Sequence, residues 1–153
     1  MILSDIIGQE ISKIRYSYQP ENEHGMQEFH SYLRFATKEV IFLPKYPDNE
    51  MDLIEYYDKN KTCSFGKAER CGMASRVLFK NKKIVDVHFR YFEGTPLEDS
   101  SGILELDNGM YITENNFGPP GLTNIDLMIL NSEQFAALGD DEIEIRSFNS
   151  MRS

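Results

Sequence analysis

Apolar and polar residues alternate along several short stretches of the chain, the pattern of β-strands with one buried face. In the clearest stretch, Val85, Val87, Phe89 and Tyr91 alternate with polar residues. This pattern predicts an α+β fold that is predominantly antiparallel β-sheet, with one or two short helices. We predict strand regions near 11–18, 32–43, 51–57, 76–92, 102–114, 124–130 and 142–148.

Two turn signals predict hairpins. Asp107, Asn108 and Gly109 separate two β-prone runs, and Asn and Gly tolerate the positive φ of a type I′ turn. A second hairpin is predicted from 77–79 to 84–91, with its turn at Asn81.

The most convincing helix signal lies at 131–139. Asn131 or Ser132 can cap its start, and Gly139 can end it. A shorter helical turn is predicted at 4–7.

The two halves of the chain resemble each other at an offset of 71 to 74 residues. We interpret this as an internal duplication of a strand–hairpin–strand unit, about 8–58 and 81–131, within a single domain that spans 1–153. Shared β-alternation is the alternative explanation. The matched segments are 11–18 with 84–91, 32–35 with 103–106, 40–41 with 111–112, and 47–53 with 120–127.

The composition is that of a folded globular protein, with 41% hydrophobic, 12% aromatic and 27% charged residues in 153. No segment reaches the roughly 20 apolar residues of a membrane-spanning helix, and residues 1–8 do not resemble a secretory signal. We therefore expect a cytoplasmic protein that does not bind a membrane. In a reducing cytoplasm Cys63 and Cys71 are expected to be free thiols.

The charge is unevenly distributed along the chain. Residues 91–145 contain no Lys, Arg or His, whereas residues 59–90 contain nine Lys or Arg and only two acids. Either the fold packs the basic segment against the acids, or the acids face outward and attract a basic partner. A solvated acidic face that only keeps the protein soluble is the alternative explanation of the outward-facing acids. The twelve acids of 91–145 are Glu93, Glu98, Asp99, Glu105, Asp107, Glu114, Asp126, Glu133, Asp140, Asp141, Glu142 and Glu144.

The sequence offers no complete catalytic or metal-binding motif. His24, His30 and His88 lack the spacing of a metal-ligand pair, so we interpret each as a surface histidine. Nothing locates a base for Cys63 or Cys71. We expect no catalytic residue, metal or cofactor. The enzymatic alternative is a small hydrolase with a carboxylate-based site, drawn from Asp52, Glu55, Glu105, Glu114 and Asp126.

Residues 109–127, read as Gly-Met-Tyr-Ile-Thr-Glu-Asn-Asn-Phe-Gly-Pro-Pro-Gly-Leu-Thr-Asn-Ile-Asp-Leu, resemble segments of bacterial immunity proteins. Those proteins are encoded beside polymorphic or contact-dependent growth inhibition toxins. The resemblance implies an antitoxin that binds and neutralises a cognate toxin domain, often a nuclease, through an acidic surface. It transfers no binding residue to this chain.

The residues and the resemblance together predict a non-enzymatic binding protein with a basic protein partner. Nucleic acid is not expected to bind directly, because phosphate binding needs a basic surface. An acidic regulatory or structural subunit is a further alternative. The residues predicted to contact the partner are Glu93, Glu98, Asp99, Asp107, Tyr111, Glu114, Phe117 and Asp126, with Asp140, Asp141 and Glu142 as a second candidate patch.

Overall fold

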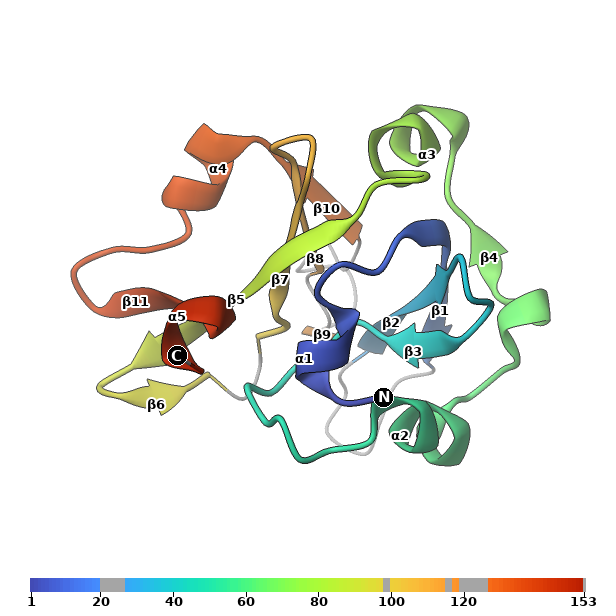
Figure 1. Cartoon of the computed structure of the whole chain (residues 1–153), viewed down its shortest axis with the longest axis horizontal. Helices are drawn as coiled ribbons and strands as arrows, with labels where there is room; N and C mark the ends of the chain where they lie inside the picture. The colour runs from blue at the N-terminus through green and yellow to red at the C-terminus, as the bar shows by residue number, and fades with distance from the viewer. Residues whose placement is uncertain (20–26, 98–99, 115–116, 119–126, 153) are drawn as a thin grey trace.

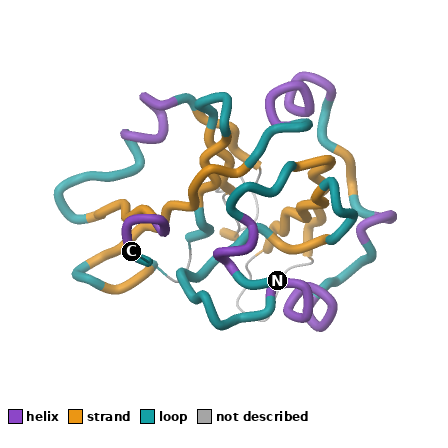
Figure 2. Tube along the Cα trace, viewed as in Figure 1, coloured by secondary structure: helices purple, strands orange, loops and turns teal. Residues whose placement is uncertain are grey.

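The structure, a computed structural model, has an α+β fold of two antiparallel sheets and a few short helices (Figures 1 and 2). In Figure 1 the long strands of the first sheet (blue to cyan) lie to the right of those of the second sheet (yellow-green to red). None of the helices in the described ranges is long and apolar enough to cross a membrane. The structure describes residues 1–19, 27–97, 100–114, 117–118 and 127–152.

The first sheet has the strand order β3-β2-β1-β4, with β9 paired to β2, and the second has the order β10-β8-β7-β5-β11, with β6 paired to β5. The strands of the first sheet are β1 (Ile11–Gln19), β2 (Gln27–Phe35), β3 (Val40–Phe42), β4 (Glu69–Arg70) and β9 (Phe117–Gly118). The strands of the second sheet are β5 (Ile84–Phe92), β6 (Thr95–Pro96), β7 (Ile103–Leu106), β8 (Tyr111–Glu114), β10 (Leu127–Leu130) and β11 (Ile143–Ser147).

The helices are short, and side-chain caps start three of them, at Asp52, Asn131 and Ser147. Asn131 caps the helix after β10, because its side chain accepts a hydrogen bond from the amide of Gln134, whose side chain accepts one in return from the Asn131 amide. This confirms the predicted start, although the helix ends before Gly139. The helices are α1 (Leu3–Ile6), α2 (Leu53–Asn60), α3 (Met73–Phe79), α4 (Ser132–Ala136) and α5 (Phe148–Met151), with a 3-10 turn, η1 (Phe65–Lys67).

One hydrophobic core joins the two sheets. Ile14 and Leu33 of the first sheet lie in the same buried cluster as Val87, Leu104 and Ile112 of the second. Each sheet therefore has an inner face that contributes to this core and an outer face turned away from it. The outer face of the first sheet is covered by α2 and η1 and holds a smaller cluster of Tyr32, Phe42, Tyr57 and Ala68.

The two sheets repeat the same register. In the first sheet Ile11 pairs with Phe35 and Ile14 pairs with Leu33. In the second sheet the equivalent pairs are Ile84 with Leu106 and Val87 with Leu104. The residues of β5 lie 73 positions after those of β1, and the residues of β7 lie 71 positions after those of β2. Both strand pairs are irregular at the same point, between Ile11 and Lys13 and between Ile84 and Asp86.

The backbone contacts that link the two halves are reciprocal. The Gly8 amide donates to the Ile84 carbonyl, and the Asn81 amide donates to the Ile11 carbonyl. Gly8 and Asn81 both have positive φ, 92° and 63°. Such equivalence is what a duplicated unit would produce, and the duplication itself stays a prediction.

Three predictions about local structure were wrong. Residues 51–57 do not form a strand, because the Asp52 side chain accepts from the amides of Ile54 and Glu55 and starts α2. Residues 77–79 lie in α3, although the chain does reverse at Asn81. The 107–109 hairpin is confirmed but not its type I′ turn, since only Gly109 of these residues has positive φ, as in a three-residue loop.

Gly102 provides a test of how closely the strands pack. A Cβ atom there would lie 2.8 Å from the carbonyl oxygen of Pro44, which the Gly102 amide already binds, and 3.0 Å from the ring of Phe89. We expect Gly102→Ala to lower the free energy of unfolding by about 2 kcal/mol, as overpacking does. Urea denaturation measures this, with Gly66→Ala as the matched control because a Cβ at Gly66 meets open space. Equal stability of the two variants would contradict the described packing.

Candidate functional site

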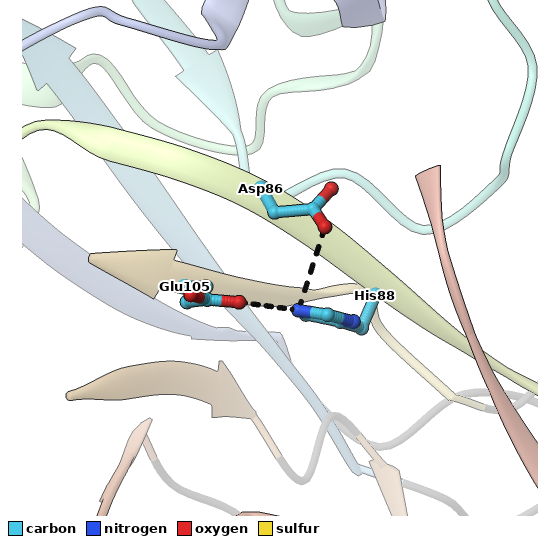
Figure 3. A group of neighbouring side chains, drawn as sticks. All are labelled: Asp86, His88 and Glu105. Carbon is cyan, nitrogen blue, oxygen red and sulfur yellow. Dashed lines mark hydrogen bonds and ion pairs between the residues drawn. The ribbon is translucent and has the colours of Figure 1, made fainter. Parts of the chain in front are cut away.

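Three chemically active side chains converge on the outer face of the second sheet, and we call them the Asp-His-Glu cluster (Figure 3). Asp86 and His88 are two residues apart on β5 and so point to the same face, while Glu105 of β7 pairs with Asp86 in register. His88 Nε2 lies 2.8 Å from Glu105 Oε1 and 3.8 Å from Asp86 Oδ2. The imidazole is thus placed between two carboxylates.

The cluster is largely shielded from solvent. The side chains of Asp86 and His88 are 13% and 12% exposed, and that of Glu105 is 30% exposed. Phe135 of α4 packs against His88, with the two ring centroids 4.8 Å apart, and stacks on Tyr111 at 4.0 Å. Electrostatic interactions inside the cluster are therefore stronger than on an open surface.

Hydrogen bonds from the chain fix the position of Asp86. Its Oδ1 accepts from the amides of Val87, at 2.8 Å, and Asn149, at 3.1 Å, and its Oδ2 accepts from the hydroxyl of Ser147. The last two donors come from the end of β11 and the start of α5. The carboxylate is therefore held rigidly by a segment about sixty residues away in the chain.

Two carboxylates so close together create a negative potential at this point. The pKa of the Tyr111 phenol is raised by burial and further by the charges of Glu105 and Asp86. Arg90 lies further along the same face of β5, and burial lowers its pKa. Within the described chain no Lys or Arg forms an ion pair with Asp86 or Glu105. The arrangement can bind a cation or exchange a proton between the imidazole and a carboxylate.

The interpretation of His88 as a surface histidine was wrong. His88 does point to the outer face of β5, as the alternation predicts. At His88, however, Phe135 of α4 packs against that face, so the imidazole is largely shielded from water. The sequence did carry one signal, since an Asp-x-His spacing in a strand puts both side chains on one face. Glu105 could not be added from the sequence, because its position depends on the strand register.

Glu114 was predicted to contact a partner, and this is a correction, because the residue is 2% exposed. Its Oε2 accepts from the Ser31 amide at 3.1 Å and from the Ser31 hydroxyl at 2.5 Å, and its Oε1 accepts from the Ser101 hydroxyl at 2.9 Å. Burial raises the pKa of this carboxyl, and the hydrogen bonds and Lys45 oppose the shift. Glu114 therefore joins the two sheets from inside.

The other predicted contact residues whose side chains the structure describes, Glu93, Asp107 and Tyr111, do not form one patch. Glu93 follows Phe92, the last residue of β5, whereas Asp107 follows Leu106, which pairs with Ile84 at the start of β5. These two exposed acids therefore lie at opposite ends of the second sheet. Tyr111 is half-buried against Phe135. The backbone of Phe117 pairs with β2. Glu98, Asp99 and Asp126 lie outside the described residues.

The exposed acids gather instead at one end of the second sheet, which we call the acidic edge. Asp140 stabilises the loop before β11, where its carboxylate accepts from the amides of Ile143 and Glu142, and these hydrogen bonds lower its pKa. Because Ile143 pairs with Phe92, the flanking acids Glu142 and Glu93 lie at the same end of the sheet. The acidic edge consists of Glu93, Asp140, Asp141, Glu142 and Glu144.

The basic residues gather on the first half of the fold. Lys13, Arg15, Arg70, Arg76 and Lys80 line a cavity of about 80 Å³ between β1 and α3. Desolvation lowers the pKa of Lys13, and the neighbouring Arg15, Arg70 and Arg76 lower it further. Among the described residues no ion pair joins a Lys or Arg of 59–90 to an acid of 93–144. The basic side chains of 59–90 therefore do not neutralise these acids by ion pairs within the described chain, although the two segments meet at the backbone, where the Asp107 amide donates to the Lys83 carbonyl.

The remaining candidates for chemistry have local structural roles. Asp52 caps α2, and Glu55 pairs with Lys59 one turn later. Cys63 and Cys71 are both free and half-buried. Burial raises the pKa of the Cys71 thiol, which disfavours the reactive thiolate.

Among the described carboxylates proposed from sequence for a hydrolase (Asp52, Glu55, Glu105 and Glu114), Glu105 is the one that pairs with a histidine, and Asp126 lies outside the described residues. Comparisons with models of protein families, with curated proteins and with solved structures find no match to this chain.

Proposed function

We propose that this chain is a non-enzymatic binding protein that captures and neutralises a basic protein, as an immunity protein does with a bacterial toxin domain. The observation that carries the proposal is the separation of charge between the two halves of the fold. The acidic edge stands at the end of the second sheet, far in the chain from the basic residues around Lys13. On this proposal the protein acts in the cytoplasm.

The acids of the second half are available to a partner. Of the nine acids in 93–144 that the structure describes, seven are exposed, and among them Glu144 forms an ion pair, with Arg146 at 3.0 Å. Unpaired exposed acids form a field that raises the association rate of a basic protein. The charge is therefore better explained by a partner than by internal pairing.

An exposed aromatic residue supplies the apolar contact that specificity requires. Phe92 is 40% exposed at the end of β5, beside Glu93 and paired with Ile143. Aromatic anchors surrounded by polar residues are typical of energetically important positions in interfaces. We therefore place Phe92 at the docking surface, in addition to the aromatic residues Tyr111 and Phe117 that the sequence predicted as partner contacts.

The partner can be identified by affinity capture from the organism that carries the gene. Three baits are compared: the wild-type chain, an acidic-edge variant and a control of equal charge. The acidic-edge variant carries Glu93→Lys, Asp141→Lys and Glu142→Lys, and the control carries Glu39→Lys, Glu50→Lys and Asp58→Lys on exposed positions of the first half. We expect one basic protein to be retained by the wild type and the control and lost by the acidic-edge variant. Retention by all three baits would contradict the proposed docking surface.

A carboxylate-based hydrolase is the second candidate, and the Asp-His-Glu cluster is the observation that favours it. The two functions make opposite predictions for His88, because an imidazole beside a carboxylate would act as the base or acid of such an enzyme. We expect His88→Ala to leave partner binding and neutralisation within a factor of about two of the wild type. Loss of neutralisation by a folded His88→Ala protein that still binds the partner would favour the enzyme.

A further inference from the structure

The ligand atoms of the Asp-His-Glu cluster have the spacing of a metal site. His88 Nε2, Glu105 Oε1 and Asp86 Oδ2 all lie within 4.8 Å of one another, and two of the separations are 2.8 and 3.8 Å. A tetrahedral cation with ligands at about 2.0–2.1 Å keeps those ligands about 3.4 Å apart. The observed separations bracket this value, and Figure 3 shows a carboxylate oxygen of Asp86 and one of Glu105 both directed at the His88 ring nitrogen.

The groups around the cluster resemble the outer shell of a metal site. Metal-binding carboxylates are themselves hydrogen-bonded, and these outer contacts hold the ligands in place. Asp86 receives such contacts from the amides of Val87 and Asn149 and from the Ser147 hydroxyl. A carboxylate offers about four lone-pair sites, so Asp86 retains capacity for a cation.

The cluster offers two carboxylates and an imidazole nitrogen to a single cation. His88 Nε2 lies 2.8 Å from Glu105 Oε1 and 3.8 Å from Asp86 Oδ2. Within the described part of the chain no Lys or Arg forms an ion pair with either carboxylate. A divalent cation would neutralise both and bind the imidazole nitrogen.

The equivalent positions in the first sheet indicate that the fold itself does not require this cluster. Lys13 pairs with Arg34 in β1 and β2 at the register where Asp86 pairs with Glu105 in β5 and β7. Arg15 occupies the position equivalent to His88, and its guanidinium lies 4.7 Å from the ring of Phe65, as His88 lies against Phe135. The same strand pairing therefore carries basic side chains at these positions in the first sheet, and two carboxylates and an imidazole in the second.

We propose that Asp86, His88 and Glu105 bind one divalent transition-metal cation of the zinc class, with a fourth coordination position open beside Tyr111. Imidazole and carboxylate ligands suit Zn²⁺ and related ions, and three protein ligands with an open position are the pattern of reactive zinc sites. The site goes beyond the proposed partner binding and does not depend on it, because it lies on the covered outer face rather than on the acidic edge.

The test is titration of the chelator-treated full chain with Zn²⁺ alone, followed by calorimetry, and with Co²⁺, followed by visible absorption. We expect one ion per chain and cobalt bands typical of a four-coordinate site. His88→Ala should abolish the bands and weaken zinc binding by about 100-fold or more, and Glu105→Gln by about 10-fold or more, given the 10–100-fold that outer contacts alone are worth. Glu105→Gln keeps a hydrogen-bond partner for His88, so it tests the ligand role even if His88→Ala fails to fold.

The control variants are His30→Ala and Asp107→Asn, which remove a histidine and an exposed carboxylate away from the cluster. Both should bind zinc as the wild type does. The proposal is overturned if the wild-type chain binds no zinc, if Glu105→Gln binds it as tightly as the wild type, or if His30→Ala weakens binding as much as Glu105→Gln.

Discussion

Replacing Glu114 with alanine should lower the free energy of unfolding by about 3 kcal/mol or more. The substitution leaves the Ser31 amide and the hydroxyls of Ser31 and Ser101 without their acceptor, in residues that are 1% exposed. Each buried donor left unsatisfied costs about 1–3 kcal/mol, and the lost side-chain volume adds a cavity. Urea denaturation measures the change, with exposed Glu39→Ala as the control. A loss below about 1 kcal/mol would mean that Glu114 does not link the sheets as described.

The same carboxyl gives a pH dependence of defined sign. Burial raises the folded-state pKa of Glu114 above its unfolded value of about 4.3, so the folded protein binds the proton more tightly. Its contribution to stability is therefore fully present below about pH 4.3 and is lost as the pH rises through the folded-state pKa. Glu114→Gln cannot ionise and should not show this loss. We expect the difference in unfolding free energy, wild type minus Glu114→Gln, to fall as the pH rises over that window; a difference that rises would contradict the assignment.

Reversing the charge of the acidic edge should slow association with the partner by about 10-fold to 100-fold, within the range that electrostatic steering supplies. The variant is the one described above, with lysine at positions 93, 141 and 142. These side chains make no hydrogen bond or ion pair with the described residues, so the fold should tolerate their replacement. Stopped-flow mixing at low salt measures the rate.

The control with lysine at positions 39, 50 and 58 changes the net charge equally. It should slow association far less, because the effect comes from local charge rather than total charge. Equal slowing by both variants would show that only the net charge of −9 matters and that the acidic edge is not the docking surface.

Much of the fold was predictable from local patterns. The alternation at 84–91 and the Asp-Asn-Gly turn identified β5 and the β7–β8 hairpin, and Asn131 identified the start of α4. The short apolar runs at 51–57 and 77–79 did not determine the type of element, because such a run is compatible both with a strand and with the apolar face of a helix. The sequence did contain the signals of a helix here: Asp52 can cap its start, and Leu53 and Tyr57 lie one turn apart on the buried side of α2. The strand prediction for 51–57 was wrong because these helix signals outweigh the apolar run.

The candidate site was less predictable because it depends on contacts distant in the chain. That Asp86 and His88 share a face follows from strand geometry, but Glu105 joins them through register and Phe135 covers them through the path of α4. The burial of Glu114 was equally hidden, since nothing local distinguishes an acid at the end of a strand from one held by Ser31, 83 residues away. Charge segregation was readable from composition, whereas its location on the acidic edge required the structure.

The most direct test of the proposed function is the association rate constant of the wild-type chain with its captured partner as a function of salt. The Debye length shrinks from about 10 Å at 0.1 M to about 3 Å at 1 M, so steering by the acidic edge should fade across this range. We expect the rate constant to fall by at least about 10-fold over that range for the wild type, and by much less for the variant with lysine at 93, 141 and 142. A wild-type rate constant that does not change with salt would contradict the proposal that the acidic edge recruits a basic partner.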